Sequence, residues 1–77
     1  MEVNLEELIS IIQMFAVEGS VISADSKLLD DEIIDSLNVV QIIAEVEARF
    51  SVKIGAMDLS FDDFESPATL AIALAKF

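Results

Sequence analysis

Apolar residues recur three and four positions apart in separate stretches of this chain, which constrains it to a set of packed helices. The first such stretch consists of Leu5, Leu8, Ile9, Ile12, Phe15 and Ala16. We expect its helix to stop at Gly19-Ser20, because glycine readily adopts the left-handed conformation that ends helices. A second helix is predicted from Asp35-Ser36 to about Phe50. Its apolar stripe consists of Val39, Ile43, Val46 and Phe50, widened by Val40 and Ile42.

Two further helices are predicted in the C-terminal third of the chain. A short one is expected at Asp58–Phe64. Ser66-Pro67 then indicates a helix start, because serine caps helices and proline suits the first helical position. The last helix runs toward Phe77 and buries Leu70, Ala73, Leu74 and Phe77 on one face. The long connection at 21–34 lacks a period, and we expect Ile22, Leu28, Leu29 and Ile34 to anchor it inward.

These elements predict an all-α fold, a small four-helix bundle of three longer helices and one short one. A long loop separates the first two helices. The chain has 77 residues and no Cys, so no disulfide can stabilise a loop-rich fold, and its 55% hydrophobic residues must supply the core. Residues 1–77 are expected to form a single domain, too small for a two-domain enzyme.

Composition also excludes several functions. Without His or Cys, the Ser–His and Cys–His nucleophile systems are impossible. A formal net charge of −11 repels nucleic acid and favours basic partners. No targeting segment and no apolar run of about 20 residues is visible, so we expect a cytoplasmic protein with no membrane span. We also expect the chain to be a monomer. No metal site and no catalytic residue are predicted, and the chain is not expected to be an enzyme.

The tripeptide Asp35-Ser36-Leu37 carries the strongest functional pattern. The long loop delivers a hydroxyl to the first turn of an amphipathic helix, where backbone N–H groups and the helix dipole favour anions. Leu37 points away from the core stripe and places an apolar side chain beside the polar one. Six acidic residues and no basic one lie between Leu28 and Ala48. Taken alone, Asp-Ser at this position could also be an ordinary helix cap.

Over essentially all 77 residues the chain resembles phosphopantetheine-dependent acyl carrier proteins. The resemblance rests on the motif Asp35-Ser36-Leu37 within LLDDEIIDSLNVVQIIAEVEARFSVKI, followed by Arg49-Phe50 and Val52-Lys53-Ile54. The segment SFDDFESP, from Ser60 to Pro67, is similar to D-alanyl carrier proteins and to peptidyl-carrier-like stand-alone domains.

The resemblance implies that Ser36 receives 4′-phosphopantetheine from coenzyme A, through a magnesium-using phosphopantetheinyl transferase that Asp35 assists. The reactive thiol would then be imported, and cargo would travel as its thioester. An adenylating or acyl-loading ligase would load it, and an acyltransferase or synthase with a basic patch would dock on the second helix. The implied partner-binding residues are Leu37, Gln41, Ala44, Glu45, Glu47, Ala48 and Ile54.

Four positions depart from the family pattern. Glu32 replaces the glycine that often precedes the motif, and Gly55 stands where a proline is usual. Asn38 and Gln41 are neutral where fatty-acid carriers tend to be acidic, which makes recognition by a standard fatty-acid synthase less favoured. Fatty-acid or lipid biosynthesis and aminoacyl transport therefore both stay open as pathways.

Two alternatives from other classes remain. An unmodified acidic protein-interaction module would leave Ser36 bare, and an enzyme with paired carboxylates would be active without a prosthetic group. The residues also leave cargo storage open. The stripe at Val39, Ile42, Ile43 and Val46, with Leu70 and Leu74, could line a cavity for a fatty chain or form a filled core.

Overall fold

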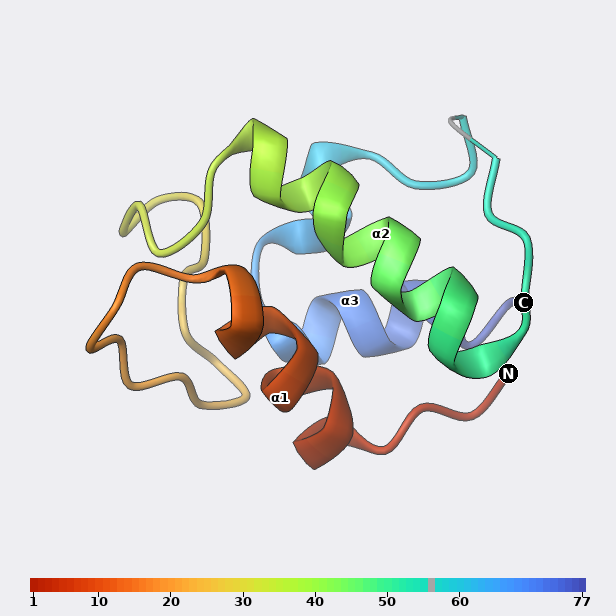
Figure 1. The fold of residues 1–77 in the computed structure, drawn as a ribbon, viewed down its shortest axis with the longest axis horizontal. Coiled ribbons are helices and arrows are strands. Elements are labelled where there is room, and N and C mark those ends of the chain that lie inside the picture. Colours follow the sequence, from red (N-terminus) through yellow and green to blue (C-terminus); the bar gives the residue numbers. More distant parts are fainter. Residues whose placement is uncertain (56) are drawn as a thin grey trace.

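Three α-helices and one short 3-10 helix make up the fold (Figure 1). The structure is a computed structural model that describes residues 1–55 and 57–77. Its elements are α1 (Leu5–Phe15), α2 (Ser36–Phe50), the 3-10 helix η1 (Phe61–Phe64) and α3 (Pro67–Leu74). Helix α1 packs against both α2 and α3, and the long loop before α2 closes one end of the molecule. At the other end, the amino group of Met1 donates a hydrogen bond to the carbonyl oxygen of Ala75 over 3.1 Å.

The prediction of a four-helix bundle was wrong, because the short helix is a single 3-10 turn with no packing face of its own. Its sequence, Phe-Asp-Asp-Phe, buries only Phe64, while Phe61 is 57% exposed. The expected start at Asp58 fails because the Asp58 carboxylate accepts a hydrogen bond from the Gly55 amide over 2.7 Å, which closes a turn instead. Within residues 1–55 and 57–77 the molecule is a three-helix fold without strands.

Helix α1 ends at Phe15, earlier than the expected stop at Gly19. Its cap, Ala16, is extended, and the next amide, that of Val17, donates to the carbonyl oxygen of Ile33 over 3.0 Å. A contact with the distant loop therefore takes the chain out of the helix. Gly19 does adopt a positive φ of 87°, in the turn that follows.

Both ends of α2 and the start of α3 follow the sequence closely, whereas α3 ends at Leu74, before the expected end near Phe77. Helix α2 ends at Phe50, where Ser51 adopts the left-handed cap conformation. Ser66 caps α3 by accepting a hydrogen bond from the Thr69 amide over 3.2 Å, and Pro67 is the first helical residue, as predicted.

The core is a continuous apolar cluster that includes side chains from all three helices, from the long loop and from η1. Its buried members are Leu8, Ile11, Ile12, Leu28, Ile34, Val39, Ile42, Val46, Ile54, Phe64, Leu70 and Leu74. The predicted loop anchors are confirmed: Leu28 and Ile34 are buried, and Ile22 and Leu29 pack partly against the cluster. One prediction on α2 was wrong, since Val40 is 63% exposed and does not widen the core stripe.

Candidate functional site

The start of α2 is held by a reciprocal pair of hydrogen bonds between Asp35 and Asn38. The Asp35 carboxylate accepts from the Asn38 amide over 3.0 Å, and the Asn38 side chain accepts from the Asp35 amide over 3.0 Å. The Asn38 side chain also donates to the side-chain oxygen of Gln41 over 2.9 Å. This capping box fixes the backbone on either side of Ser36.

Ser36 is the first residue of α2 and is exposed to solvent. In the described part of the chain its hydroxyl has no hydrogen-bond partner, and the amides of Ser36 and Leu37 have no acceptor. Unpaired amides and the positive end of the helix dipole favour a negative group at this position. The geometry therefore suits a phosphate ester on the Ser36 hydroxyl.

The other serines do not offer an equivalent hydroxyl. Hydrogen bonds engage the side chains of Ser20, Ser23, Ser26, Ser60 and Ser66. Ser10 lies within α1, and Ser51 lies at the C-terminal end of α2, where the dipole disfavours an anion. Only Ser36 combines an exposed, unengaged hydroxyl with a helix N-terminus among the described residues.

One residue of the long loop before α2, Glu32, adopts a backbone conformation that is unusual for a residue with a side chain. Glu32 has φ 56°, in the left-handed region that favours glycine. The departure from the family pattern noted at Glu32 therefore falls where a glycine would relieve strain. Glu32, Asp35 and Asn38 also line a surface hollow of about 400 Å³ beside the motif.

The uncharged residues predicted to bind partners share one face of α2. Leu37, Gln41, Ala44 and Ala48 are exposed and follow one another at helical spacing. Leu37 is the largest apolar side chain on this face and is 65% exposed. Ile54 is different, because it is buried and only 8% exposed.

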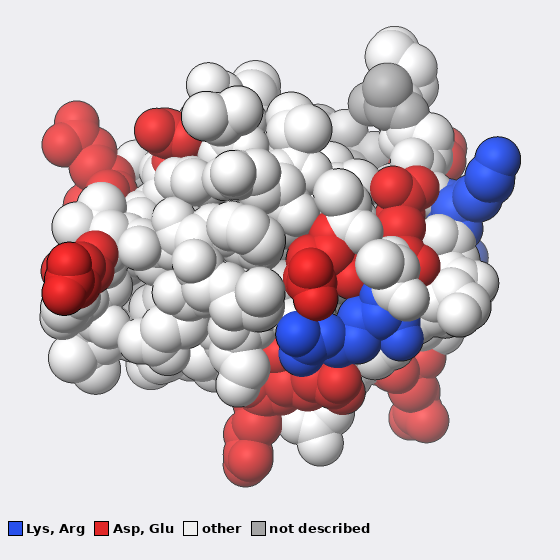
Figure 2. All heavy atoms as spheres, viewed as in Figure 1, with Lys and Arg blue, Asp and Glu red and all other residues white. Residues whose placement is uncertain are grey.

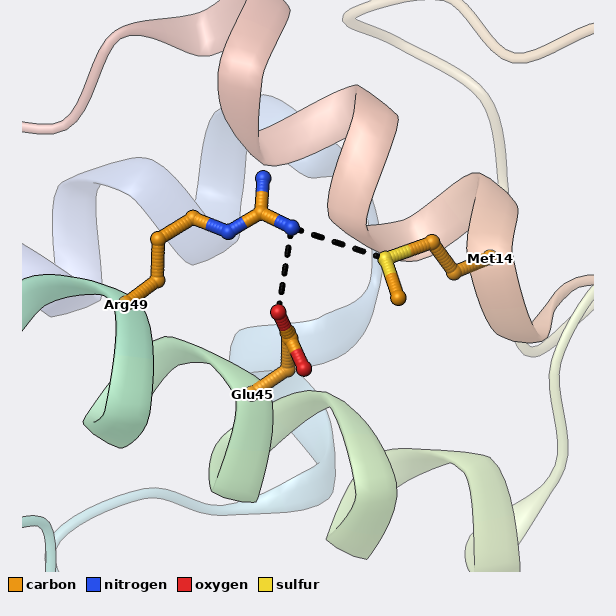
Figure 3. Close-up of polar contacts among 3 residues, drawn as sticks. All are labelled: Met14, Glu45 and Arg49. Carbon is orange, nitrogen blue, oxygen red and sulfur yellow. Dashed lines mark hydrogen bonds and ion pairs between the residues drawn. The ribbon is translucent and has the colours of Figure 1, made fainter.

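The two acidic residues predicted to bind partners already have intramolecular contacts. Glu45 forms an ion pair with Arg49 over 3.0 Å, and Arg49 also contacts the sulfur of Met14 on α1 over 3.7 Å (Figure 3). Glu47 accepts a hydrogen bond from the Ile54 amide over 2.9 Å and so caps the segment after α2. Glu45 therefore faces α1, while Glu47 is tied to the segment that follows α2.

A surface groove that the sequence did not predict lies between α2 and the segment that contains η1. It has a volume of about 550 Å³ and is lined by Val39, Val40, Ile43, Ala44, Glu47, Ile54, Leu59, Ser60, Phe61 and Phe64. Val40 and Phe61 could have indicated the groove, because they are large apolar side chains that the core does not bury. Helical spacing places Val40 beside the core stripe, and Phe61 lies on η1 across the groove from it.

The interior of the fold is filled. The space between α2, α3 and η1 that is lined by Ile42, Val46, Leu70 and Leu74, among others, has a volume of about 0 Å³. Of the two arrangements that the sequence left open, the structure shows the filled core.

Charge is distributed unevenly over the surface. Figure 2 shows uncharged atoms over most of the N-terminal part of α2, and Lys and Arg side chains beside acidic ones toward its C-terminal end. Among the residues that the structure describes, no helix is long and apolar enough to cross a membrane.

Comparison with protein families agrees with this geometry. Residues 6–74 match the family described as phosphopantetheine attachment site (PP-binding), a span that includes the whole of α2 and its capping box. Comparison with curated proteins gives no significant match. The chain therefore belongs to the phosphopantetheine-binding carrier family and bears a site for covalent 4′-phosphopantetheine.

Proposed function

We propose that this chain is an acyl or aminoacyl carrier that is modified at Ser36. The observation that carries the proposal is the exposed Ser36 hydroxyl at the start of α2, within the matched family region. When attached, the prosthetic arm supplies a thiol that holds cargo as a thioester. The chain itself has no Cys, so the thiol comes from the arm, and in this proposal the chain's own residues position and present that arm.

The residues around Ser36 have separate roles in this proposal. Asp35 caps α2 with its carboxylate and also presents a negative charge to the transferase that modifies the serine. The unpaired amides at the start of α2 stabilise the phosphate once it is attached. Leu37, Gln41, Ala44 and Ala48 form a small, uncharged contact face for the transferase, the loading ligase and the accepting enzyme.

The direct test is intact mass spectrometry after incubation with coenzyme A, magnesium and a phosphopantetheinyl transferase. We expect the mass of one phosphopantetheine group on the wild-type chain and none on Ser36→Ala. Ser10→Ala is the matched control, since it removes another exposed hydroxyl and should be modified like the wild type. Modification of Ser36→Ala would show that another residue carries the arm and would overturn the assignment to Ser36. No modification of the wild type would favour the unmodified interaction module.

A further inference from the structure

One face of α2 leads directly from the attachment site into the groove. Ser36, Val40, Ile43 and Glu47 follow one another at spacings of four, three and four, so they lie in line along the helix. At a rise of 1.5 Å per residue, Glu47 lies roughly 16 Å along the axis from Ser36. The groove begins one turn after Ser36, at Val39 and Val40, and reaches Glu47 and Ile54.

The groove is largely apolar. Its walls include the aliphatic side chains of α2 on one side and Leu59, Phe61 and Phe64 on the other. Glu47 is the one charged residue among those that line it, and Ser60 is the one other polar residue. The Glu47 side chain is partly exposed and lies beside these apolar side chains.

That charge has no cationic partner within the described chain. The ion pair there joins Arg49 to Glu45, and neither Lys nor Arg lies within 4.0 Å of the Glu47 carboxylate. One carboxylate oxygen accepts the Ile54 amide over 2.9 Å, which holds the side chain in place and leaves the second oxygen to other donors. Glu47 is thus a hydrogen-bond acceptor held in place at the end of the groove that is farther from Ser36.

From this arrangement we infer that the groove seats the cargo end of the Ser36-linked arm, and that Glu47 selects cargo with an ammonium group beside the thioester, an aminoacyl group. This inference rests on the proposed function. An ammonium group would give Glu47 a charge-assisted hydrogen bond. A plain acyl chain in the same place would desolvate the carboxylate without replacing its bonds to water. The space between α2, α3 and η1 is closed in the structure and leaves no room for a long chain.

The test compares three cargoes on the same arm. The chain is loaded at Ser36 with coenzyme A analogues whose thiol is replaced by an amine, which carry alanyl, propionyl or hexanoyl groups in stable amide linkage. Alanyl differs from propionyl by its ammonium group alone. The readout is the backbone amide NMR shifts of Val40, Ile43 and Ile54, measured at low salt.

We expect the alanyl arm to shift these three amides, Ile54 most, and the propionyl arm to leave Ile54 almost unchanged. A partly exposed ion pair of this kind changes the ratio of docked to free arm by about twofold to fivefold. Glu47→Gln should remove the difference between alanyl and propionyl, because glutamine still accepts the Ile54 amide but has no charge. Glu45→Gln is the matched control and should keep the difference, since Glu45 faces α1.

A salt titration of the wild-type chain provides a readout that needs no variant. The shifts specific to alanyl should shrink as salt is raised, because screening weakens an exposed pair. Equal shifts for alanyl and propionyl, or a larger shift for hexanoyl that persists in Glu47→Gln, would overturn the inference. If the mass of the arm never appears on Ser36, the proposed function fails instead, before any cargo is compared.

Discussion

At the scale of single residues, three described positions adopt the left-handed backbone region: Gly19, Glu32 and Ser51. Gly19 does so without steric cost, and nothing lies within 4 Å of a Cβ built there. Glu32 and Ser51 carry side chains and are strained. Glu32 matters most for function, because it sits in the loop that delivers Asp35 and Ser36 to the start of α2.

We therefore predict that Glu32→Gly raises the free energy of unfolding by about 0.5–1 kcal/mol. Glycine removes the steric cost of the left-handed conformation in the folded state. It also raises the conformational entropy of the unfolded chain, which offsets part of the stabilisation. Urea denaturation monitored by circular dichroism measures the change.

Two variants separate backbone strain from charge at this position. Glu32→Gln removes the same negative charge and keeps the strain, so it should stay close to the wild type. Gly19→Ala introduces strain where there was none and should destabilise the chain by about 1 kcal/mol. If Glu32→Gly and Glu32→Gln raised the free energy of unfolding equally, the cause would be the lost charge and not the relieved backbone strain.

At the scale of elements, the caps were the most predictable features. Asp35 before α2 and Ser66 before α3 start helices through hydrogen bonds to residues three positions away, which local sequence specifies. The end of α1 was not predictable, because it depends on the hydrogen bond between the Val17 amide and the distant Ile33 carbonyl. Phe61 and Phe64 likewise look equivalent in sequence, yet one is exposed and the other is buried.

The exposed face of α2 gives a prediction at this scale. Leu37→Ala should lower kcat/KM of the phosphopantetheinyl transferase for this chain by about fivefold, the effect of losing about 1 kcal/mol of contact energy. Thermal unfolding should be nearly unchanged, because Leu37 is 65% exposed. A continuous assay of modification rate checks the effect.

Ile72→Ala is the control for this experiment, since Ile72 is 76% exposed on α3. It removes a similar amount of apolar surface from a different helix and should leave the rate unchanged. Equal losses for both variants, or none for Leu37→Ala, would contradict the proposed contact face.

At the scale of the whole molecule, the dominant property is a net charge of −11 on a chain with a radius of gyration of 11.1 Å. Acidic groups so close together repel one another in the folded state. The ion pair between Arg49 and Glu45 offsets little of this, because partly exposed pairs contribute about 0.2–1 kcal/mol.

We predict that added salt stabilises the fold. The Debye screening length falls from about 30 Å at 0.01 M to about 10 Å at 0.1 M, so the repulsion is screened over a distance similar to the radius of the molecule. A gain of about 1 kcal/mol would raise Tm by about 4–8 °C in a domain of this size. Thermal unfolding in sodium chloride and in tetramethylammonium chloride measures the effect and tests whether it is specific to one cation. A fall in Tm with salt would show that attractive pairs outweigh the repulsion.

The sequence by itself determined the helical class, the starts of α2 and α3, the buried anchors of the long loop and the motif around Ser36. These features depend on helical spacing and on caps that involve near neighbours. Tertiary structure alone decided that η1 is a single turn, that Val40 and Phe61 flank a groove, and that Glu47 lines this groove and accepts the Ile54 amide. The reason is that spacing places a side chain on a face, whereas its exposure depends on which distant segment packs against that face.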